Sequence, residues 1–455
     1  MNKLANEGIY NAKELGAGKV IVLGLQHMFA MFGATVLVPL LTGLDVSTTL
    51  LFAGLGTLLF HLLTKRKVPA FLGSSFAFLG GYAAIAPMLE DGSSNIEMIP
   101  YACFGVACAG LLYLVLAALI KFFSAKKIMK FFPPIVTGPI IIAIGLTLSK
   151  SAIDNCSSNW GIALVAILVV IICNIFGKGM IKIVPILIGV IASYVVAILF
   201  NQVDFSGVQS AAWIGFPIHK EMTVLALFGE NFDIAKLITA IITIMPIALA
   251  TIVEHIGDIS AISSTTNRNY IKDPGLHRTL LGDGLATIVA SLFGAPANTT
   301  YGENTGVLNL SKVYDPFVVR LAACFAIFFS FCPKFAAVIQ AMPAATVGGI
   351  SLVLYGMISA VGVRNIVENQ VDFTASRNVI IAALILVLSI GINYSAAGAI
   401  AFHVGGITIS LSGLAVGALT GIILNAILPG KDYVFDEDEP SDTHVNFQVG
   451  VREEN

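Results

Sequence analysis

Long, nearly uncharged apolar runs recur along the whole chain and constrain its fold more than any other feature. An α-helix that crosses the hydrocarbon layer of a bilayer needs about 20 consecutive apolar residues. The sequence is 57% hydrophobic and only 11% charged, whereas soluble domains carry about 25% charged residues. A soluble fold could not cover its surface with so few charges, so the excess apolar surface must face lipid. We therefore predict an all-α polytopic membrane protein.

We place about fourteen lipid-crossing helices along the chain, guided by apolar runs of roughly 17–25 residues. The third and tenth are interrupted by Pro, Gly, Ser or Asn. Residues 1–17 are polar, with no cleavable signal, so we expect the first apolar run to be a retained helix. The predicted spans are residues 18–42, 46–63, 70–88, 100–122, 131–149, 159–177, 180–200, 239–262, 279–294, 296–310, 314–332, 342–361, 377–394 and 406–428.

Basic residues alternate between successive loops and indicate the orientation. Short cytoplasmic loops collect Lys and Arg under the positive-inside rule. If the N-terminus is cytoplasmic, residues 65–67 and 126–130 fall in inner loops and carry clusters of Lys or Arg, whereas Glu90 and Asp91 fall in an outer loop. Lys150, Lys220 and Lys334 are outer exceptions. We expect both termini to be cytoplasmic.

Short motifs recur in the same order about half a chain apart. Seven spans per half is an odd number, so the second half would enter the membrane from the opposite side. The sequence therefore predicts a 7+7 inverted repeat, a common architecture of secondary transporters, although chance matches of Pro and Gly are the alternative. The paired motifs are Gln26-His27 with Glu254-His255, Pro69-Ala70 with Pro296-Ala297, and Pro133 and Gly138 with Pro343 and Gly348.

Spans three and ten begin with residues that form poor helices, in Val68–Phe78 and Pro296–Gly306. Unpaired backbone in hydrocarbon is costly, so extended backbone survives only where protein or a cavity covers it. Discontinuous helices at matching positions in two halves point to a substrate site. We expect two short extended segments, each leading into a short helix whose free N–H groups face the ligand. Two ordinary Pro-kinked spans are the alternative.

Three acidic residues stand out within the apolar spans: Glu254, Asp258 and Glu303. A charged Asp at the centre of a membrane helix costs about 2.5–3.5 kcal/mol on insertion scales, so such residues are functional candidates by default. Glu254 and Asp258 are four positions apart and share a helix face. A carboxyl group held away from water can exist protonated near neutral pH, which gives a route to proton coupling. The alternative is that these groups pair with buried polar partners and only pack helices.

Other polar residues in the spans leave their roles open. His27 is either a hydrogen-bond partner of the carboxylates or a satisfied core histidine. Asp283 is either a helix-end or a gate residue near the inner end of span nine, and His255 points away from Glu254. The six cysteines show no metal-ligand spacing and are expected to pack. The absence of HExxH, GxSxG and P-loop motifs disfavours an enzyme, and the net charge of −2 gives no reason to expect a nucleic-acid partner.

Several rare polar motifs, in order, resemble those of the nucleobase–ascorbate transporters, also called nucleobase:cation symporter-2, and of their bacterial uracil permease branch. The resemblance extends from about residue 18 to 430. Glu303 opens the segment Glu303–Gly306, where a Glu is similar to the uracil branch, Gln is typical of purine members and Pro of ascorbate members. The motifs are Gln26–Thr35, Gly73–Phe78, Glu254–Gly257, Asp273–Gly275 and Asn298–Asn304.

The resemblance implies a core domain that moves against a gate domain, and it also implies a homodimer. The core would comprise residues 18–122 (spans 1–4) and 239–332 (spans 8–11). The gate would comprise residues 123–200 (spans 5–7) and 333–430 (spans 12–14). An extracellular loop at 201–238 and cytoplasmic tails at 1–17 and 431–455 complete the expected organisation.

By resemblance, Glu254 and Glu303 accept hydrogen bonds from the ring N–H groups of uracil. The backbone N–H groups of Phe76 and Gly302 would donate to its carbonyls, and the Phe76 ring would pack beside the base. These roles suit uracil, whose ring alternates two donors with two acceptors. Ser75 and Tyr355 complete the expected substrate-binding set, with Tyr355 facing the site from the gate.

The expected coupling ion is the proton, with no other cofactor and no metal. The residues expected to carry it are Glu254, Asp258, Glu303 and His27. Some uracil permeases have His at the position of Asp258, and many relatives have Asp. The resemblance therefore supports the proton-coupling role of Asp258 less strongly than the binding role of Glu254.

These features together predict a secondary active transporter of the cell inner membrane, embedded in lipid, that imports uracil by proton symport with an elevator-like alternating-access mechanism. A xanthine or urate permease on the same scaffold is the close alternative. An anion carrier or a passive channel with the same inverted repeat is a third reading. Acidic rather than basic intramembrane residues argue against an anion carrier, and gradient-driven accumulation would exclude a channel.

Overall fold

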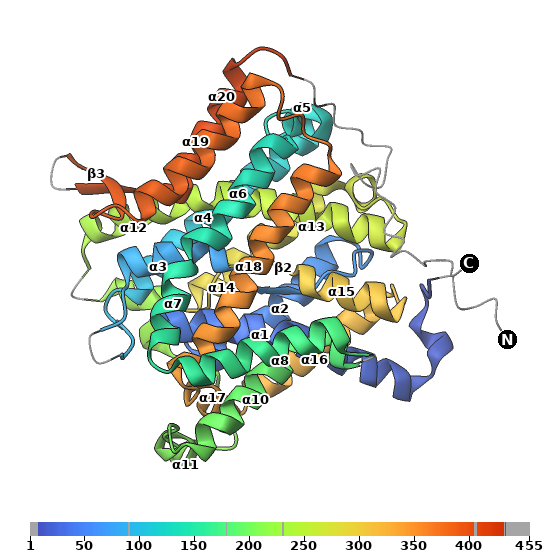
Figure 1. The fold of residues 1–455 in the computed structure, drawn as a ribbon, viewed down its shortest axis with the longest axis vertical. Coiled ribbons are helices and arrows are strands. Elements are labelled where there is room, and N and C mark those ends of the chain that lie inside the picture. Colours follow the sequence, from blue (N-terminus) through green and yellow to red (C-terminus); the bar gives the residue numbers. More distant parts are fainter. Residues whose placement is uncertain are drawn as a thin grey trace.

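The computed structural model describes residues 8–89, 92–178, 180–229, 232–404, 407–431 and 433, and these are mostly helical (Figure 1). Within them, seven helices or continuous helix pairs are long and apolar enough to cross a membrane, or eight if a pair bent by 87° is one span. They are α1 (Ala17–Thr42), α2 (Val46–Leu63), α4 (Ile99–Phe123), α6 with α7 (Pro134–Thr147 and Ser149–Ser157), α12 with α13 (Ile234–Ile244 and Ala248–Thr266), α18 (Ala344–Glu368), α19 (Ser376–Asn393) and the bent pair α16 and α17 (Pro316–Ser330 and Pro333–Gln340).

Shorter apolar helices occupy the other predicted spans. Each of the fourteen predicted segments contains a helix, but several are too short to count alone as spans, so the number fourteen stays a prediction. The shorter helices are α3 (Leu79–Ile85), α8 (Trp160–Phe176), α9 (Met180–Ile183), α10 (Pro185–Leu199), α14 (Leu276–Leu292), α15 (Gly302–Ser311) and α20 (Gly413–Ile427), with α5 (Ala125–Met129) and α11 (Ser206–Ser210) in connections.

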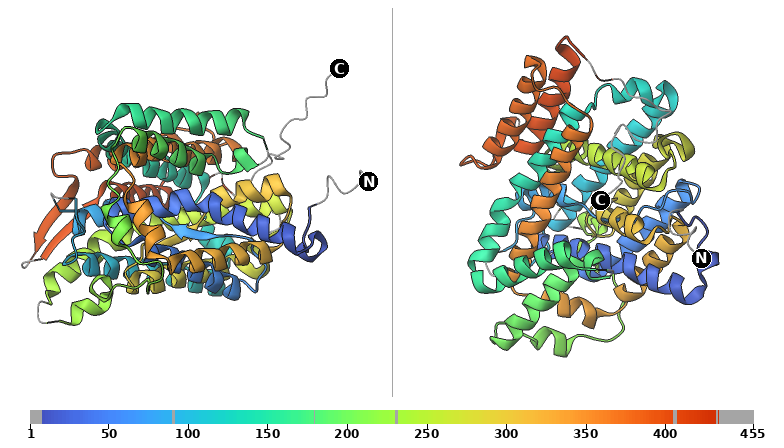
Figure 2. Two further views of the ribbon diagram at one scale, coloured as in Figure 1. Left: turned by 90° about the horizontal axis from the view of Figure 1, so that it is seen from below. Right: turned by 45° about the vertical axis from the view of Figure 1, so that its right-hand side comes forward.

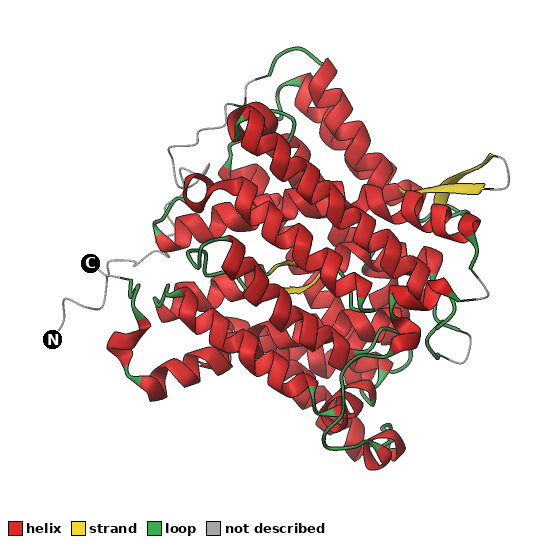
Figure 3. Ribbon diagram, turned by 180° about the vertical axis from the view of Figure 1, so that it is seen from behind, coloured by secondary structure: helices red, strands yellow, loops and turns green. Residues whose placement is uncertain are grey.

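Two predicted boundaries are wrong. The predicted loop at 201–238 ends early, because α12 begins at Ile234, where Asp233 accepts hydrogen bonds from the N–H groups of Ala235 and Lys236. The predicted span 406–428 is helical only from Gly413, because Ile407–Ser412 forms strand β4 and pairs with β3 (Ala399–Val404). The alternation of apolar and hydroxyl residues along 407–412 is a strand pattern. This hairpin projects from the helical body in Figures 1 and 3.

Side-chain caps fix where many of the helices begin. The carboxylate of Asp45 accepts a hydrogen bond from the N–H of Thr48 at the start of α2, and Asn159 and Asp315 cap α8 and α16 in the same way. Such caps satisfy N–H groups that the helix itself leaves unpaired. The helices α6 and α18 instead start directly after Pro133 and Pro343, which hold extended backbone. The two prolines that mark the predicted internal repeat therefore each precede the start of a helix.

The helices pack as two groups. In the first helix group, α14 packs on α4 and α2, and α16 packs on α2 and α1. In the second helix group, α18 packs on α6 and α8, while α19 packs on α6 and α20; α6 and α18 run side by side in Figure 1. Two further helices connect the groups. Helix α10 packs on α8 and α18 of the second group and contacts α1 of the first, and α13 packs on α4 of the first group and contacts α6 and α20 of the second. Figure 2 shows α8 and α10 as a layer on one side of α1.

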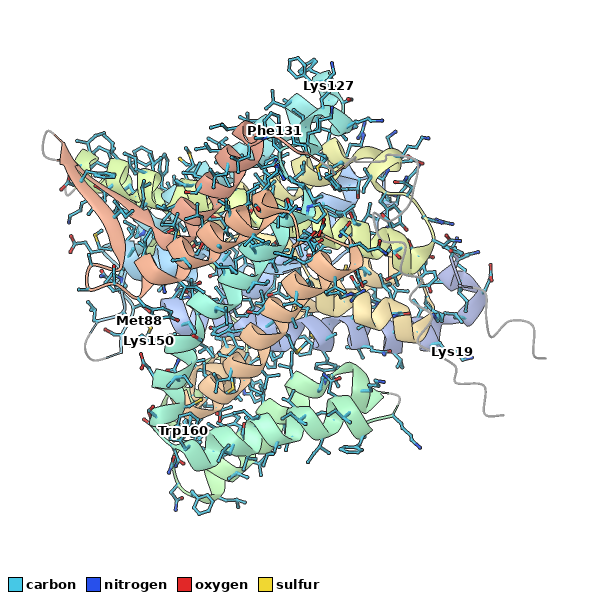
Figure 4. All side chains as sticks on the ribbon, turned by 45° about the horizontal axis from the view of Figure 1, so that its top comes forward. Lys19, Met88, Lys127, Phe131, Lys150 and Trp160 are labelled. Carbon is cyan, nitrogen blue, oxygen red and sulfur yellow. The ribbon has the colours of Figure 1, made fainter. Side chains whose placement is uncertain are left out.

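Charged side chains lie at the periphery of both groups. Lys19, Lys127 and Lys150 are exposed and point away from the packed centre in Figure 4. Exposed apolar residues such as Phe122, Ile175 and Phe328 instead cover the flanks of the helices, which is the distribution expected of a chain whose flanks face lipid.

The N-terminal strap, residues 8–16, ties two parts of the first helix group together. Its backbone pairs with the segment after α15, since the N–H of Ile9 donates to the carbonyl of Lys312 at 2.7 Å. The hydroxyl of Tyr10 donates to the carbonyl of Thr266 at the end of α13 at 2.6 Å. The Tyr10 ring also lies 4.0 Å from the guanidinium carbon of Arg268. The strap therefore joins α13 to α15.

We expect Tyr10→Ala to lower the apparent melting temperature of the detergent-purified protein. The lost cation–π contact and hydrogen bond are each worth roughly 0.5–1.5 kcal/mol. Tyr10→Phe keeps the ring and should lower the melting temperature by a smaller amount. Equal melting temperatures for Tyr10→Ala and the wild type would show that the strap does not stabilise the fold.

Candidate substrate site

Two extended segments cross at the centre of the molecule. Strand β1 (Leu72–Ser74) pairs antiparallel with β2 (Asn298–Thr300), and the partner of Gly73 is Thr299. The pairing extends at one end, where the N–H of Ser75 donates to the carbonyl of Ala297 at 2.8 Å. Figure 3 shows this short pair enclosed by helices. The prediction of extended backbone in spans three and ten is confirmed, and each segment satisfies the backbone of the other.

Side chains from the surrounding helices satisfy the outer edges of the pair. Thr57 of α2 accepts a hydrogen bond from the N–H of Leu72 at 2.9 Å. On the other strand, Thr287 of α14 donates to the carbonyl of Asn298 at 2.8 Å. The hydroxyl of Tyr301 donates to the carbonyl of Ser74 at 2.8 Å and so joins the two segments directly. Buried backbone groups without water need such partners, so the crossing is held rigidly.

A short helix follows each strand. After β1 comes the 3-10 helix Phe76–Phe78 and then α3, and after β2 comes α15. Neither Ser75 nor Tyr301, the residues that precede these helices, caps the helix start with its side chain. The first N–H groups of a helix have no partner within the helix and carry partial positive charge. Both helix starts can therefore donate hydrogen bonds to a ligand.

A cavity of about 480 Å³ lies between the two helix groups. Both helix starts reach its wall, through Phe76 and Gly302. Helix α13 contributes Glu254 and Asp258, and α18 contributes apolar residues such as Met357 from the opposite side. The cavity thus combines two sets of N–H donors, two carboxyl groups and an apolar wall.

The carboxyl groups of Glu254 and Asp258 are both partly buried. The hydroxyl of Thr300, in β2, donates to Oδ2 of Asp258 at 2.9 Å. A Cβ built on Gly302 would lie 3.7 Å from Oδ1 of Asp258, and one built on Gly257 would meet no atom within 4 Å. The helix face between the two acidic residues therefore leaves open space beside the start of α15.

The predicted site residues fall into three sets. Phe76, Glu254, Asp258 and Gly302 line the cavity. Ser75 is buried directly beside Phe76, and Tyr355 is buried with its ring edge-on to the Phe76 ring at 5.8 Å between centroids. His27 and Glu303 form the third set.

His27 is buried and contacts α15 rather than the cavity. The side-chain nitrogen of Asn304 lies 3.1 Å from Nδ1 of His27 and donates to the His27 carbonyl at 3.1 Å. The side chain of Glu303 lies outside the described residues, although its backbone forms the first turn of α15.

Of the two roles considered for Asp283, the helix-end role is wrong, and the gate role stays a prediction. Helix α14 begins at Leu276, three residues before the predicted span, so Asp283 lies two turns inside it. Its side chain is fully buried, and Oδ2 lies 2.8 Å from Nδ1 of His255. His255 does point away from the cavity, as expected.

Sequence reasoning missed a polar group at one mouth of the cavity. The last turns of α18 place Arg364, Asn365 and Glu368 in the cavity wall, with Thr137 of α6 beside them. Asn365 donates to the hydroxyl of Thr137 at 2.8 Å, and Arg364 pairs with Glu368. Both Arg364 and Glu368 lie beyond the predicted span, which ended at residue 361, and their spacing of four was the available signal that the helix continues.

Comparisons with known proteins agree with this architecture. A model of the Permease family matches residues 18–398. The chain is 39% identical over 439 residues to the uracil permease of Bacillus caldolyticus, covering 93% of this chain and 96% of the relative. It is 37% identical over 442 residues to the uracil permease of Bacillus subtilis, covering 94% and 96%.

Among solved structures, the transmembrane domain of the cyanobacterial bicarbonate transporter BicA superposes with a TM-score of 0.57 and 15% identity, covering 92% of this chain and 99% of that domain. At this identity the likeness concerns the fold alone. The chain is a multi-pass membrane protein, a transporter and not an enzyme, and it belongs to the Permease family, that of the nucleobase–ascorbate transporters whose motifs it carries.

Proposed function

We propose that this protein imports uracil by proton symport. The observation that carries the proposal is the meeting of two uncapped helix starts and two intramembrane carboxyl groups in one cavity. Uracil presents two ring N–H donors and two carbonyl acceptors, which match carboxylate acceptors and backbone N–H donors. The names of the two Bacillus relatives support the choice of base.

Each residue then has a role in binding. Glu254 accepts a hydrogen bond from a ring N–H, and the Phe76 and Gly302 N–H groups donate to the carbonyls. The Phe76 ring stacks on the base, and Tyr355 holds that ring edge-on from the second helix group. Glu303 is the second acceptor, and Ser75 precedes the helix start that Phe76 opens. A site that pairs every polar group of its ligand discriminates strongly against bases that leave a group unpaired.

Proton coupling belongs to the same cluster. Asp258 is partly buried, lines the cavity and accepts a hydrogen bond from the hydroxyl of Thr300. A carboxyl group in such a place can gain and lose a proton as the cavity opens to either side. Glu254 and Glu303 belong to the same acidic set, and His27 supports it by fixing Asn304 next to Glu303. The proton is the only cofactor in this proposal.

Alternating access follows from the two helix groups. We propose that the first group, together with α13 and α15, forms the core and that the second group forms the gate. The cavity reaches Lys182 and Arg364, and the positive-inside rule makes that end cytoplasmic. The core then carries the site across the membrane against the gate, in an elevator-like motion. A homodimer, with both termini cytoplasmic, remains part of this proposal.

The test is labelled uracil uptake into proteoliposomes with an imposed proton gradient. We expect uracil to accumulate when the interior is alkaline and accumulation to collapse on adding a protonophore. Uracil uptake that does not depend on the proton gradient would contradict proton coupling. Unlabelled xanthine and urate are the matched competitors, and stronger competition by either than by uracil would favour the purine alternative.

An anion carrier remains the alternative from a different class, since the fold is shared with a protein described as a bicarbonate transporter. The carboxyl groups of Glu254 and Asp258 in the cavity wall would repel an anion at short range. Bicarbonate should therefore not compete with uracil uptake in the same assay.

A further inference from the structure

A buried pair of ionisable side chains lies behind the cavity and takes no part in substrate binding. Nδ1 of His255, on α13, lies 2.8 Å from Oδ2 of Asp283, on α14, and neither side chain is exposed. Neither residue lines the cavity. Within the described part of the chain, Nε2 of His255 and both carboxylate oxygens of Asp283 have no aligned hydrogen-bond partner, so the contact between the two side chains is a short charge contact.

A single residue, Thr300, connects the His255–Asp283 pair to the cavity. The hydroxyl oxygen of Thr300 lies 3.5 Å from Nδ1 of His255 and donates to Oδ2 of Asp258 at 2.9 Å. Thr300 is also fixed by its backbone, because it is the strand partner of Leu72. Asp283, His255, Thr300 and Asp258 therefore form one line of contacts from α14 to the cavity wall.

Helix packing alone does not account for the pair. Replacing a buried ion pair with well-packed apolar residues is often neutral or stabilising, so such a pair is poor evidence of a purely structural role. The rings of Phe60 and Tyr113 lie edge-on to His255, at 6.3 and 6.4 Å between centroids. The chain nevertheless keeps an imidazole and a carboxylate in close contact among these rings.

Other titratable groups face this line of contacts. Helix α4 contributes the phenol of Tyr113, which lies near Asp283, Glu254 and Asp258. The helices α6 and α20, which also pack on α13, carry no titratable residue. Helix α13 itself carries Glu254 and Asp258, and the first turn of α14 carries His277 and Arg278. The Ile271–Gly275 segment adds Lys272 and Asp273, of which Asp273 pairs with Lys67. Farther along α4 lie Tyr101, Cys103, Cys108 and Lys121. The side chain of Glu303 lies outside the described residues.

We propose that His255, Asp283 and Thr300 are positioning residues for the proton-carrying carboxyl group of Asp258. Nδ1 of His255 lies against both the Asp283 carboxylate and the Thr300 hydroxyl oxygen, so the ring links these two side chains, and the Thr300 hydroxyl hydrogen holds Asp258 in one orientation beside the start of α15. This inference rests on the proposed function and adds to it that proton coupling depends on His255 and Asp283, which do not line the cavity.

The test separates proton coupling from uracil movement. Exchange of labelled for unlabelled uracil at equal pH needs no net proton transfer, whereas accumulation driven by a proton gradient does. We expect Asp283→Asn and Thr300→Val to keep exchange within about threefold of wild type and to lose gradient-driven accumulation by about tenfold or more. Thr300→Ser, which restores a hydroxyl, should recover accumulation.

Ser291→Ala is the matched control on α14, since Ser291 is fully buried and its hydroxyl has no partner among the described residues. It should retain both activities. Thr300→Val is isosteric and keeps the proposal testable if Asp283→Asn does not fold.

If Asp283→Asn and Thr300→Val lose exchange and accumulation in parallel, the residues have a structural role and the inference is wrong. Wild-type accumulation in both variants would also contradict it. A wild-type protein that exchanges no uracil would instead overturn the proposed function, and this inference with it.

Discussion

Glu254→Ala is expected to abolish uracil binding. Its carboxylate lines the cavity from α13 and is the described acidic group that we assign to a ring N–H of the base. Truncation removes a charge-assisted hydrogen bond and leaves a buried donor of uracil unpaired, and an unpaired buried donor loses its hydration without compensation. Binding of labelled uracil to the purified protein measures the effect.

Glu254→Gln is a milder substitution at the same position. The amide keeps the size and one acceptor oxygen but loses the charge. Hydrogen bonds to charged groups are worth about 1.5–3 kcal/mol, so the affinity for uracil should fall roughly 10- to 100-fold.

Glu97→Gln is the matched control for Glu254→Gln. Glu97 pairs with Lys236 at 2.7 Å on the exposed surface, so the same chemical change there should leave the affinity for uracil unaltered. Equal affinity in Glu254→Gln and wild type would remove Glu254 from the site.

Gly73→Ala is expected to lower uracil uptake at least tenfold and to destabilise the protein. A Cβ on Gly73 would lie 2.5 Å from two carbons of the Tyr301 ring and 2.7 Å from the hydroxyl of Thr35. The Tyr301 ring cannot swing away freely, because its hydroxyl is bound to the Ser74 carbonyl. Overpacking of this kind costs roughly 1–3 kcal/mol, and here the strain falls on the crossing that places both helix starts.

Gly80→Ala, in α3, is the control for this substitution. A Cβ there would meet no atom within 4 Å, and Ala is the better helix former. We expect uptake and thermal stability of Gly80→Ala to equal or exceed the wild-type values. Wild-type uptake by Gly73→Ala would show that the crossing of β1 and β2 can shift without loss of function.

Much of the fold could be predicted because it follows from local properties of the chain. The apolar runs and the scarcity of charge require a membrane protein, whatever the details of packing. Extended backbone at residues 72–74 and 298–300 was predictable from Pro, Gly and Asn in otherwise apolar spans. The hairpin of β3 and β4 was missed, although the alternation in Ile407–Ser412 carried its signal, because an apolar run near a helix was assigned to the helix.

The site was predictable in part. The intramembrane cost of an acidic residue singles out Glu254 and Asp258 without any structure, and both line the cavity. The resemblance to a family supplied Phe76 and Gly302, which no composition or spacing would have identified. Arg364 and Asn365 were not predicted as site residues, because polar residues are common at the ends of membrane spans and do not by themselves indicate a site.

The sequence by itself determined the membrane class, the two broken spans and the acidic residues, because transfer of each segment or side chain into lipid has a cost that depends on that segment or side chain alone. Only the tertiary structure decided that Tyr301 bonds to Ser74, 227 positions away, and that Asp283 faces His255 rather than the end of its helix. Such contacts depend on how distant helices pack, and packing is a property of the whole set of neighbours, which no single segment encodes.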